Sequence, residues 1–396
     1  MATTSPGLNK DTCSTLVELL RGYAGEQPHR TVYYWLSDGE TAETTMTYGE
    51  LDRRARAIGA RLQQMQTAGS RALLCHAPGL EFITAFLGCL YSGVTAVPAY
   101  APHSRRDISR LKSISSDCDP SLILTTGTHA RAAENLLSGA GHEHNCLITD
   151  NVDWDTAGEW KQPDLKSSDL AYLQYTSGST TTPKGVMISH ANLLANLDYI
   201  DRSGDFDSES VSISWLPHFH DMGLIYGILQ PIYSRFPAYL FSPAAFIQQP
   251  LRWLQAISDH RVTHTGGPNF AYDLCHERVT EEQLERLDLH CWRIAFNGSE
   301  PVHQETLERF AKRFSGCGMP ESGRHYHAVL GCVLSVTPQE VQEIWMEMAG
   351  RQKHGAGAKV EIYDPNRNGL SYVLKSINHP DSDWHLSLVH PPILTK

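Results

Sequence analysis

The sequence has no dense run of lysine and arginine, and its formal net charge is -11 over 396 residues. Binding to a nucleic-acid backbone needs clustered cations, so this composition argues against DNA or RNA as a partner. An anionic small molecule would have to be held by local hydrogen-bond donors, because the overall field of the protein is negative.

Cysteines with the spacing of a metal site are also missing. The nine cysteines are scattered, their number is odd, and no C-x-x-C pair occurs. This pattern indicates neither a disulfide framework nor a zinc site. We therefore expect the cysteines to be small core residues in a reducing cytoplasm.

No uninterrupted hydrophobic run is long enough to span a bilayer. Residues 82–100 are uncharged, but Gly88, Gly93 and Pro98 divide them, which favours a buried helix followed by a strand. The N-terminal segment MATTSPGLNKDTCSTLVELL contains acidic side chains and does not resemble a signal peptide. We therefore expect no transmembrane segment and a cytoplasmic location.

Helical and strand patterns alternate along the first half of the chain. A chain of 396 residues exceeds what one hydrophobic core normally serves, so more than one domain or subdomain is expected. Segments with helical spacing separate strand-like segments at residues 31–36, 71–76, 94–97, 121–125 and 146–149. This succession predicts an α/β fold with mainly parallel sheets flanked by helices.

A polar loop lies between two predicted strands, residues 169–175 and 186–189. Gly178 and Gly185 allow the backbone to turn so that several N–H groups point at one centre, a geometry that favours an anion. Hydroxyl groups add further donors, and Lys184 adds a compact positive charge. The predicted phosphate-binding residues are Thr176, Ser177, Gly178, Ser179, Thr180, Thr181, Thr182 and Lys184.

The spacing of this loop differs from the Walker A pattern, because Pro183 rather than glycine precedes Lys184. A solvated linker rich in serine and threonine is the simpler alternative. The shortness of the loop, and the predicted helix at residues 190–199 directly after the second strand, favour a phosphate cradle.

A second cluster begins where a predicted strand, residues 212–216, ends in Pro217. In α/β folds, ligands tend to bind at the carboxyl ends of the strands. A lone histidine is more often structural, but a carboxylate beside an imidazole fixes the orientation of the ring. The segment His218-Phe219-His220-Asp221, with two histidines followed by a carboxylate, is therefore a candidate for binding a ligand at this strand end.

Two further segments carry glycine near a strand end. Gly266 and Gly267 indicate backbone that approaches another group closely, although a tight turn also explains them. Residues 297–301 follow a predicted strand at residues 293–296, and the asparagine and serine there offer hydrogen bonds to the edge of a flat ligand lying on Gly298. A strand end that caps the next helix is the alternative interpretation.

Together these segments resemble the adenylate-forming, or AMP-binding, superfamily. The phosphate-loop pattern of that superfamily, TSGSTGTPKGV, matches except that Thr181 replaces the second glycine, and HFHDMG with NGSEP narrows the similarity to the fatty acyl-AMP ligases. The resemblance implies a large domain of two α/β subdomains that binds ATP with Mg²⁺ and a fatty acid. It implies formation of an acyl-adenylate with release of pyrophosphate, and transfer of the acyl group to the phosphopantetheine of an acyl-carrier protein.

The resemblance also implies a role for each segment. Lys184 and His220 would be catalytic, with His220 positioning the carboxylate, whereas no role is implied for His218. The adenine would bind Asn297, Gly298, Ser299, Glu300 and Pro301. The acyl site would contain Trp215, His220, Asp221, Met222, Gly223, Gly266 and Gly267.

The motif resemblance covers residues 15–318 and then stops. The superfamily would next show a Tyr-Gly-x-x-Glu segment, a ribose-binding aspartate and a small lid domain with a catalytic lysine. We find none of these in residues 319–396, and this motivates the hypothesis of a truncated or frame-shifted sequence. We expect a first α/β subdomain at 1–168, a second at 169–318 and a divergent tail at 319–396. The alternatives are an acyl-CoA synthetase, which shares these motifs, and a nucleotide- or lipid-binding remnant with little turnover.

Overall fold

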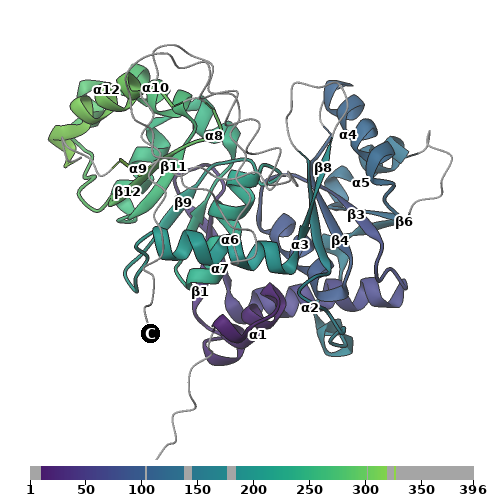
Figure 1. Ribbon diagram of the computed structural model, residues 1–396. Helices are drawn as coiled ribbons and strands as arrows, with labels where there is room; N and C mark the ends of the chain where they lie inside the picture. Colours follow the sequence, from purple (N-terminus) through teal and green to yellow (C-terminus); the bar gives the residue numbers. More distant parts are fainter. Residues whose placement is uncertain are drawn as a thin grey trace, which may run out of the picture.

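The computed structural model describes residues 10–102, 105–137, 145–175, 184–300, 302–318 and 325–326. Two sheets flanked by helices form the two lobes of the molecule, with β8 (Gly185–Ser189) near the junction between them (Figure 1). The predicted α/β class with mainly parallel sheets is confirmed.

Sheet I has six strands in the order β6-β5-β3-β4-β7-β8. All neighbours are parallel except β7 and β8, which form an antiparallel hairpin. The strands that precede β8 are β3 (Arg71–His76), β4 (Thr95–Tyr100), β5 (Leu122–Thr125), β6 (Asn145–Ile148) and β7 (Leu170–Tyr175). The helices α2 (Tyr48–Gln64) and α3 (Leu80–Ser92) cover one face, and α4 (Arg105–Cys118) and α5 (Gly127–Leu137) cover the other.

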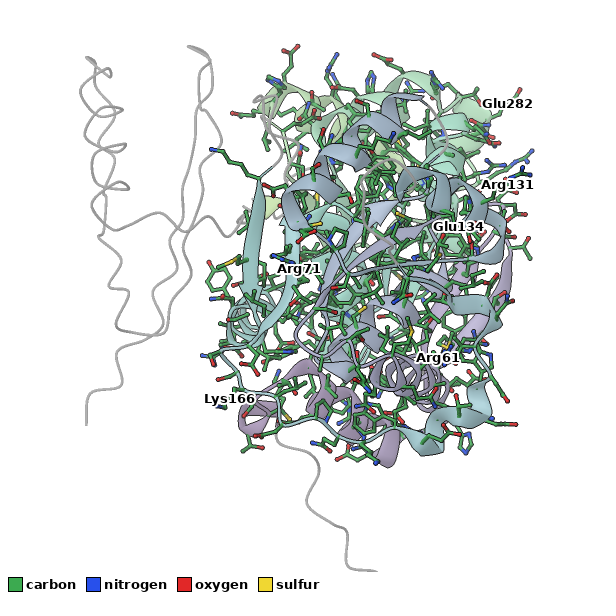
Figure 2. All side chains as sticks on the ribbon, turned by 90° about the vertical axis from the view of Figure 1, so that its right-hand side faces the viewer. Arg61, Arg71, Arg131, Glu134, Lys166 and Glu282 are labelled. Carbon is green, nitrogen blue, oxygen red and sulfur yellow. The ribbon has the colours of Figure 1, made fainter. Side chains whose placement is uncertain are left out.

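Side chains of sheet I alternate between two hydrophobic clusters. In β3, Ala72 and Leu74 belong to the cluster that contains α2 and α3, whereas Leu73 and Cys75 belong to the cluster that contains α4 and α5. A parallel sheet covered on both faces needs such continuous apolar strands. On the outer side of α5, the side chains labelled Arg131 and Glu134 in Figure 2 face solvent.

Sheet II has seven strands in the order β13-β12-β11-β9-β10-β1-β2. Apart from the antiparallel pair β1 and β2, its neighbours are parallel, so β9, β11 and β12 end at the same edge. The strands are β1 (Thr31–Leu36), β2 (Ala42–Thr47), β9 (Ser212–Ser214), β10 (Ala238–Leu240), β11 (His264–Gly267), β12 (Ile294–Asn297) and β13 (His325–Tyr326).

The two sheets interleave along the chain instead of following the expected division at residue 168. β1 pairs with β10 and so joins sheet II, while β7 pairs with β4 and joins sheet I. Strand patterns predict which segments are extended, but they do not specify the partner of each strand. β13 lies beyond residue 318, in the segment expected to diverge, and it extends sheet II as the parallel neighbour of β12.

The helix predicted at residues 190–199 is present and continues to Ser203. A capping box formed by Thr47 and Glu50 opens α2, and the uncharged segment 82–100 forms α3 and β4. In the part of the chain described here, no helix is both long enough and apolar enough to cross a membrane. The remaining α-helices are α1 (Leu16–Glu26), α6 (His190–Ser203), α7 (Gln230–Ser234), α8 (Pro243–Gln248), α9 (Leu251–Asp259), α10 (Asn269–Arg278), α11 (Glu281–Leu284) and α12 (Gln304–Phe314). Short 3₁₀ turns occur at η1 (Lys10–Thr12), η2 (Thr149–Asn151), η3 (Trp154–Glu159) and η5 (Ser315–Cys317), and η4 (Gly223–Leu229) is a π-helix.

Candidate active site

The predicted phosphate loop is closed by the hairpin of β7 and β8. Tyr175, at the end of β7, pairs with Gly185, at the start of β8. A Cβ atom on Gly185 would lie 2.9 Å from Cζ of Tyr175, so the position favours glycine. The Tyr175 hydroxyl donates a hydrogen bond to Asp117 Oδ2 at 2.5 Å, which ties the base of the loop to α4.

The loop itself lies largely outside the described residues. This applies to the predicted ligands Thr176, Ser177, Gly178, Ser179, Thr180, Thr181 and Thr182, and also to Pro301 of the predicted adenine segment. Lys184 is described, and its side chain is exposed directly before β8. An exposed lysine at the end of the hairpin loop can reach an anion bound there.

The predicted carboxylate turn follows β9. The His220 N–H donates to the Pro217 carbonyl at 3.0 Å, and the Met222 N–H donates to Asp221 Oδ1 at 2.8 Å. His220 Nδ1 lies 2.7 Å from the same Asp221 oxygen, so the expected contact between imidazole and carboxylate is present. The His220 side chain is 35% exposed, which leaves part of the ring open to a ligand.

Gly223 begins the π-helix η4 directly after this turn. A Cβ atom there would lie 2.2 Å from the Pro217 carbonyl oxygen, so the backbone of η4 packs against the start of the turn. π-Helical turns are rare and occur frequently at functional sites. The close approach therefore fixes where Asp221 and Met222 lie relative to Pro217.

Gly266 and Gly267 lie within β11, so the tight turn that was the alternative interpretation is wrong. A Cβ atom on Gly266 would lie 1.9 Å from the Phe296 carbonyl oxygen, and one on Gly267 would lie 2.8 Å from Cζ2 of Trp215. The expected close approach of backbone to another group is therefore confirmed. The neighbouring groups are the adjacent strand β12 and the indole of the predicted acyl site.

The predicted adenine segment begins at Asn297, the last residue of β12. The buried Asn297 side chain donates from Nδ2 to Asn269 Oδ1 at 3.1 Å, while its Oδ1 has no hydrogen-bond partner among the described residues. Ser299 has a φ of 70°, in the left-handed region that non-glycine residues rarely adopt. Glu300 accepts the Phe270 N–H at 2.6 Å and so caps α10.

Contacts between the strand ends bring these segments together. From β7, the Gln174 side chain donates to the Phe219 carbonyl at 2.9 Å. The Ser299 hydroxyl donates to Met222 Sδ at 3.1 Å, which joins the adenine segment to the carboxylate turn. The flanks of the predicted phosphate, acyl and adenine segments therefore meet at the carboxyl ends of β7, β9 and β12, where α/β folds bind ligands.

Residues 20–342 match the protein family described as AMP-binding enzyme. The chain belongs to this family. The family match extends beyond residue 318, the last residue of the motif resemblance seen in the sequence. It therefore includes β13 of this AMP-binding enzyme.

Relatives and solved structures agree with the family assignment. The chain is 44% identical over 317 residues to the medium-chain-fatty-acid acyl-carrier-protein ligase JamA of Moorena producens, a match that covers 78% of this chain and 54% of JamA. A fatty acid AMP ligase from Legionella pneumophila superposes with a TM-score of 0.76 at 40% identity, covering 81% of this chain and 56% of that one. A fatty acyl-adenylate ligase from L. pneumophila in complex with acyl adenylate and pyrophosphate gives 0.73 at 41% identity, covering 78% and 54%. This AMP-binding enzyme thus spans about half the length of the relatives it matches.

Sequence patterns missed two side chains at the centre of this AMP-binding enzyme. Gln174 and His218 are both buried, and both hydrogen-bond to main-chain carbonyls where the strand ends meet. The signal for Gln174 was a single amide in the otherwise apolar strand LAYLQY. His218 was noticed, but the family motif implied no role for it.

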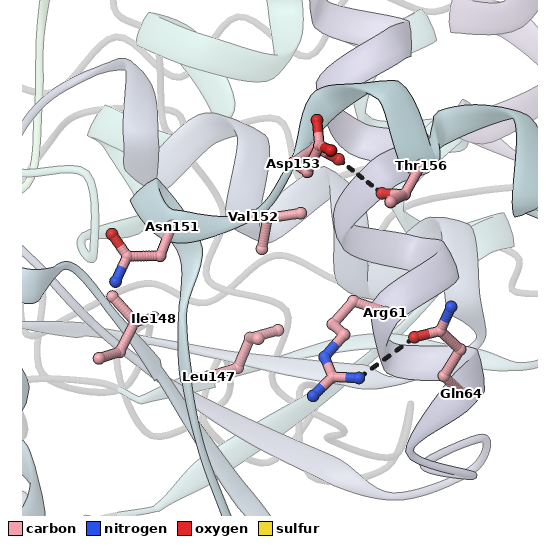
Figure 3. Close-up of a pocket in the computed structure, with 8 residues that line it drawn as sticks. All are labelled: Arg61, Gln64, Leu147, Ile148, Asn151, Val152, Asp153 and Thr156. Atoms are coloured by element: carbon pink, nitrogen blue, oxygen red, sulfur yellow. Dashed lines mark hydrogen bonds between the residues drawn. The ribbon is translucent and has the colours of Figure 1, made fainter.

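A pocket of about 250 Å³ lies away from these segments, beside β6 (Figure 3). It is lined by Arg61, Gln64, Leu147, Ile148, Asn151, Val152, Asp153 and Thr156. None of the predicted site residues of the AMP-binding enzyme contributes to it. β6 and β8 occupy opposite edges of sheet I. The pocket is therefore separate from the phosphate hairpin, which is the hairpin of β7 and β8 that closes the predicted phosphate loop.

The described residues contain no group of three or more histidine, cysteine, aspartate or glutamate side chains arranged to hold a metal ion. Most cysteines in the described part are buried, in agreement with the core role expected from the sequence: Cys75, Cys89, Cys118, Cys275 and Cys317.

Proposed function

We propose that this AMP-binding enzyme activates a fatty acid as an acyl-adenylate, releases pyrophosphate and passes the acyl group to an acyl-carrier protein. The meeting of the three predicted segments at one set of strand ends carries this proposal. The contacts from Gln174 to Phe219 and from Ser299 to Met222 support a ligand that extends from phosphates through a carboxylate to a purine. The fatty-acid ligase activity named for JamA supports the substrate class.

In the proposed reaction, a carboxylate oxygen of the fatty acid attacks the α-phosphorus of ATP. A new O–P bond forms as the bond from the α-phosphorus to the bridging oxygen breaks, and that electron pair leaves with pyrophosphate. The enzyme would promote this step by positioning the two reactants and by stabilising negative charge. The loop closed by Tyr175 and Gly185, with Lys184 at its end, would hold the phosphates.

His220 would hold the attacking carboxylate. Asp221 Oδ1 lies 2.7 Å from Nδ1, which the Met222 N–H also approaches at 3.3 Å, and the opposite ring nitrogen faces away from Asp221. The opposite ring nitrogen, Nε2, would donate to the fatty-acid carboxylate. Asp221 would thus orient the ring.

Asn297 would recognise the adenine. Its buried Oδ1 acceptor has no partner among the described residues, and the exocyclic amino group of adenine is a donor. A buried acceptor without a partner is unfavourable, so binding of an amino group there would remove that penalty. Ser299 and Met222, which are in contact, would border the same part of the nucleotide.

Mg²⁺ would bind together with ATP. Hydroxyl and phosphate oxygens are the hard ligands that this ion prefers, and the loop between β7 and β8 is rich in hydroxyl side chains. When bound, the ion would neutralise charge on the phosphates. The protein's own share in this arrangement would be the loop hydroxyls and Lys184.

The direct test is acid-dependent release of pyrophosphate by the 396-residue chain, measured across fatty acids of increasing length with ATP and Mg²⁺. We expect release with at least one fatty acid, and acyl transfer to a phosphopantetheinylated carrier protein faster than to coenzyme A. Faster transfer to coenzyme A would identify an acyl-CoA synthetase instead. ATP binding without any acid-dependent release would identify a nucleotide-binding protein.

Two substitutions with matched controls separate the proposed roles. Lys184→Ala should weaken ATP binding, and the exposed Lys166→Ala is its control. His220→Ala should mainly reduce acid-dependent turnover. Its control is His290→Ala, because His290 Nδ1 makes a similar contact with Asp288 Oδ1 at 2.9 Å on the exposed surface. Equal losses of ATP binding and turnover in both site variants would contradict the separate roles.

A further inference from the structure

The turn that carries His220 belongs to sheet II but rests on sheet I. His218 Nε2 lies 3.1 Å from the Ala99 carbonyl oxygen in β4, and Gln174 Nε2 in β7 donates to the Phe219 carbonyl at 2.9 Å. The Phe219 ring also packs edge-on against Tyr100, with ring centroids 5.1 Å apart. Two successive residues of the turn are therefore hydrogen-bonded to neighbouring strands of the other sheet.

Both hydrogen-bonding side chains are buried. His218 is 4% exposed and Gln174 is 5% exposed, so water does not compete for these bonds. A carbonyl can only accept, and therefore His218 Nε2 carries the proton and donates to Ala99. Burial lowers the pKa of His218 to about 4, so the ring stays neutral near neutral pH. It does not serve there as a charged ligand.

Aromatic packing holds the His218 ring in this orientation. The ring centroid lies 4.1 Å from that of Phe82 in α3 and 5.4 Å from that of Phe219. Nδ1 of His218 and Oε1 of Gln174 have no hydrogen-bond partner among the described residues. Each side chain leaves one polar atom without a partner there. Gln174 Nε2 also lies 3.5 Å from the carbonyl oxygen of its neighbour Tyr175, so the bonds to Ala99 and Phe219 are the ones that join the two sheets.

We propose that Gln174 and His218 are positioning residues that hold the turn at residues 217–222 in register with the strand bearing the phosphate loop. Gln174 is separated from that loop by Tyr175 alone, and His218 is separated from His220 by Phe219 alone. The two bonds therefore connect segments that lie one residue away from the proposed phosphate and carboxylate sites. This inference rests on the proposed function.

The geometry of the proposed reaction explains why such a connection matters. The carboxylate and the α-phosphorus must meet in line, but the residues that would hold them come from different sheets. A misplacement of about 1 Å between reacting groups lowers a rate by about a hundredfold. Bonds that join the two sheets beside the site reduce this freedom without touching either substrate.

The test compares Gln174→Leu and His218→Phe with two controls that make the same chemical change. Gln230 is buried and donates to the Leu197 carbonyl at 3.2 Å, so Gln230→Leu is the control for the amide. His264 is buried at the start of β11, and its Nε2 lies 2.8 Å from the Gly204 carbonyl oxygen, so His264→Phe is the control for the imidazole. All four substitutions remove a buried donor to a main-chain carbonyl.

Calorimetry with a non-reactive dodecanoyl sulfamoyl adenosine, and separately with a non-hydrolysable ATP analogue, measures the two parts of the site. The site variants should bind the acyl mimic about tenfold more weakly, the effect of one lost hydrogen bond, while affinity for the ATP analogue stays within about twofold. The controls should bind both compounds like the wild type. His218→Gln, which can still donate to Ala99, should recover part of the affinity.

Hydrogen exchange supplies a readout that needs no ligand. Backbone amides of residues 218–222 should exchange faster in the site variants than in the controls, even where all four variants lose similar thermal stability. Wild-type affinity for the mimic in both site variants, with unchanged exchange of the turn, would overturn the positioning role. Failure of the wild type to bind the mimic would instead refute the proposed function, and this inference with it.

Discussion

A methyl group added at Gly266 is the sharpest probe of the packing between β11 and β12. Gly266 pairs with Phe296 in the parallel ladder, and its added Cβ atom would lie 1.9 Å from the Phe296 carbonyl oxygen. That oxygen belongs to the backbone, so it cannot rotate away as a flexible side chain would. The two strands would have to separate by more than about 1 Å to restore ordinary van der Waals contact.

The cost of Gly266→Ala follows from two effects. Overpacking of a close-packed interior destabilises a protein by about 1–3 kcal/mol. The Phe296 carbonyl also accepts the Tyr272 hydroxyl at 2.7 Å, and weakening this buried hydrogen bond adds about 1 kcal/mol. We therefore expect the free energy of unfolding to fall by about 3 kcal/mol. Asn297 follows Phe296 directly, so ATP binding should weaken as well.

Urea unfolding followed by tryptophan fluorescence measures this change, and Gly25→Ala is the matched control. Gly25 lies in α1 with no atom within 4 Å of an added Cβ, so alanine there should raise stability by up to about 1 kcal/mol. A Gly266→Ala variant within about 0.5 kcal/mol of the wild type, with unchanged ATP affinity, would refute the reasoning. Such a result would mean that β11 and β12 separate freely.

Three further predictions concern the same strand ends. Ser299→Gly should raise the free energy of unfolding by less than about 1 kcal/mol in urea titrations, because glycine adopts a φ of 70° without strain but the hydrogen bond to Met222 Sδ is lost. Glu300→Ala should lower the melting temperature and cost about 1 kcal/mol, since Glu300 caps α10 through the Phe270 N–H, and unchanged melting would contradict that role. Burial lowers the pKa of His76 to about 3 and that of His218 to about 4, both from an ordinary 6.5. Between pH 6.5 and 4 the unfolded chain therefore binds protons that the folded chain does not, so stability should fall as the pH is lowered, by about 3 kcal/mol for His218. Urea midpoints measured from pH 7 downward check this fall, and His76→Gln should make it less steep.

Local structure followed closely from residue patterns wherever burial dictated the pattern. The segment TVYYWL predicted β1 with its observed bounds, and the pattern Thr-x-x-Glu at Thr47 and Glu50 agrees with the start of α2. By contrast, β2 has the sequence AETTMT, whose few apolar residues give little strand signal. It forms because β1 offers it a hydrogen-bonding edge, which is a tertiary effect that residue patterns do not contain.

Sheet membership was the part of the fold that patterns could not supply. Residues 31–36 and residues 212–214 are far apart in the sequence, yet β1 and β9 both pair with β10. Nothing in the composition of β1 distinguishes a partner in sheet II from one in sheet I. The division at residue 168 assumed that neighbours in sequence share a sheet. That assumption does not hold, because β1 lies in sheet II and β7 lies in sheet I.

The candidate site shows the same difference between chemistry and geometry. Charged and hydroxyl residues that no core needs, such as Lys184 and Asp221, stand out in the sequence because an apolar pattern does not explain them. Gln174 and His218 do not stand out, because a buried amide or imidazole is explained equally well by a satisfied core contact. Yet the phosphate hairpin belongs to sheet I, and the turn with His220 follows β9 of sheet II. The relative position of the two proposed binding segments therefore depends on contacts between the sheets. Candidate ligand-binding residues can therefore be inferred from their type, whereas the proposed positioning residues become visible only when the carbonyl oxygens of Ala99 and Phe219 are found opposite their donors.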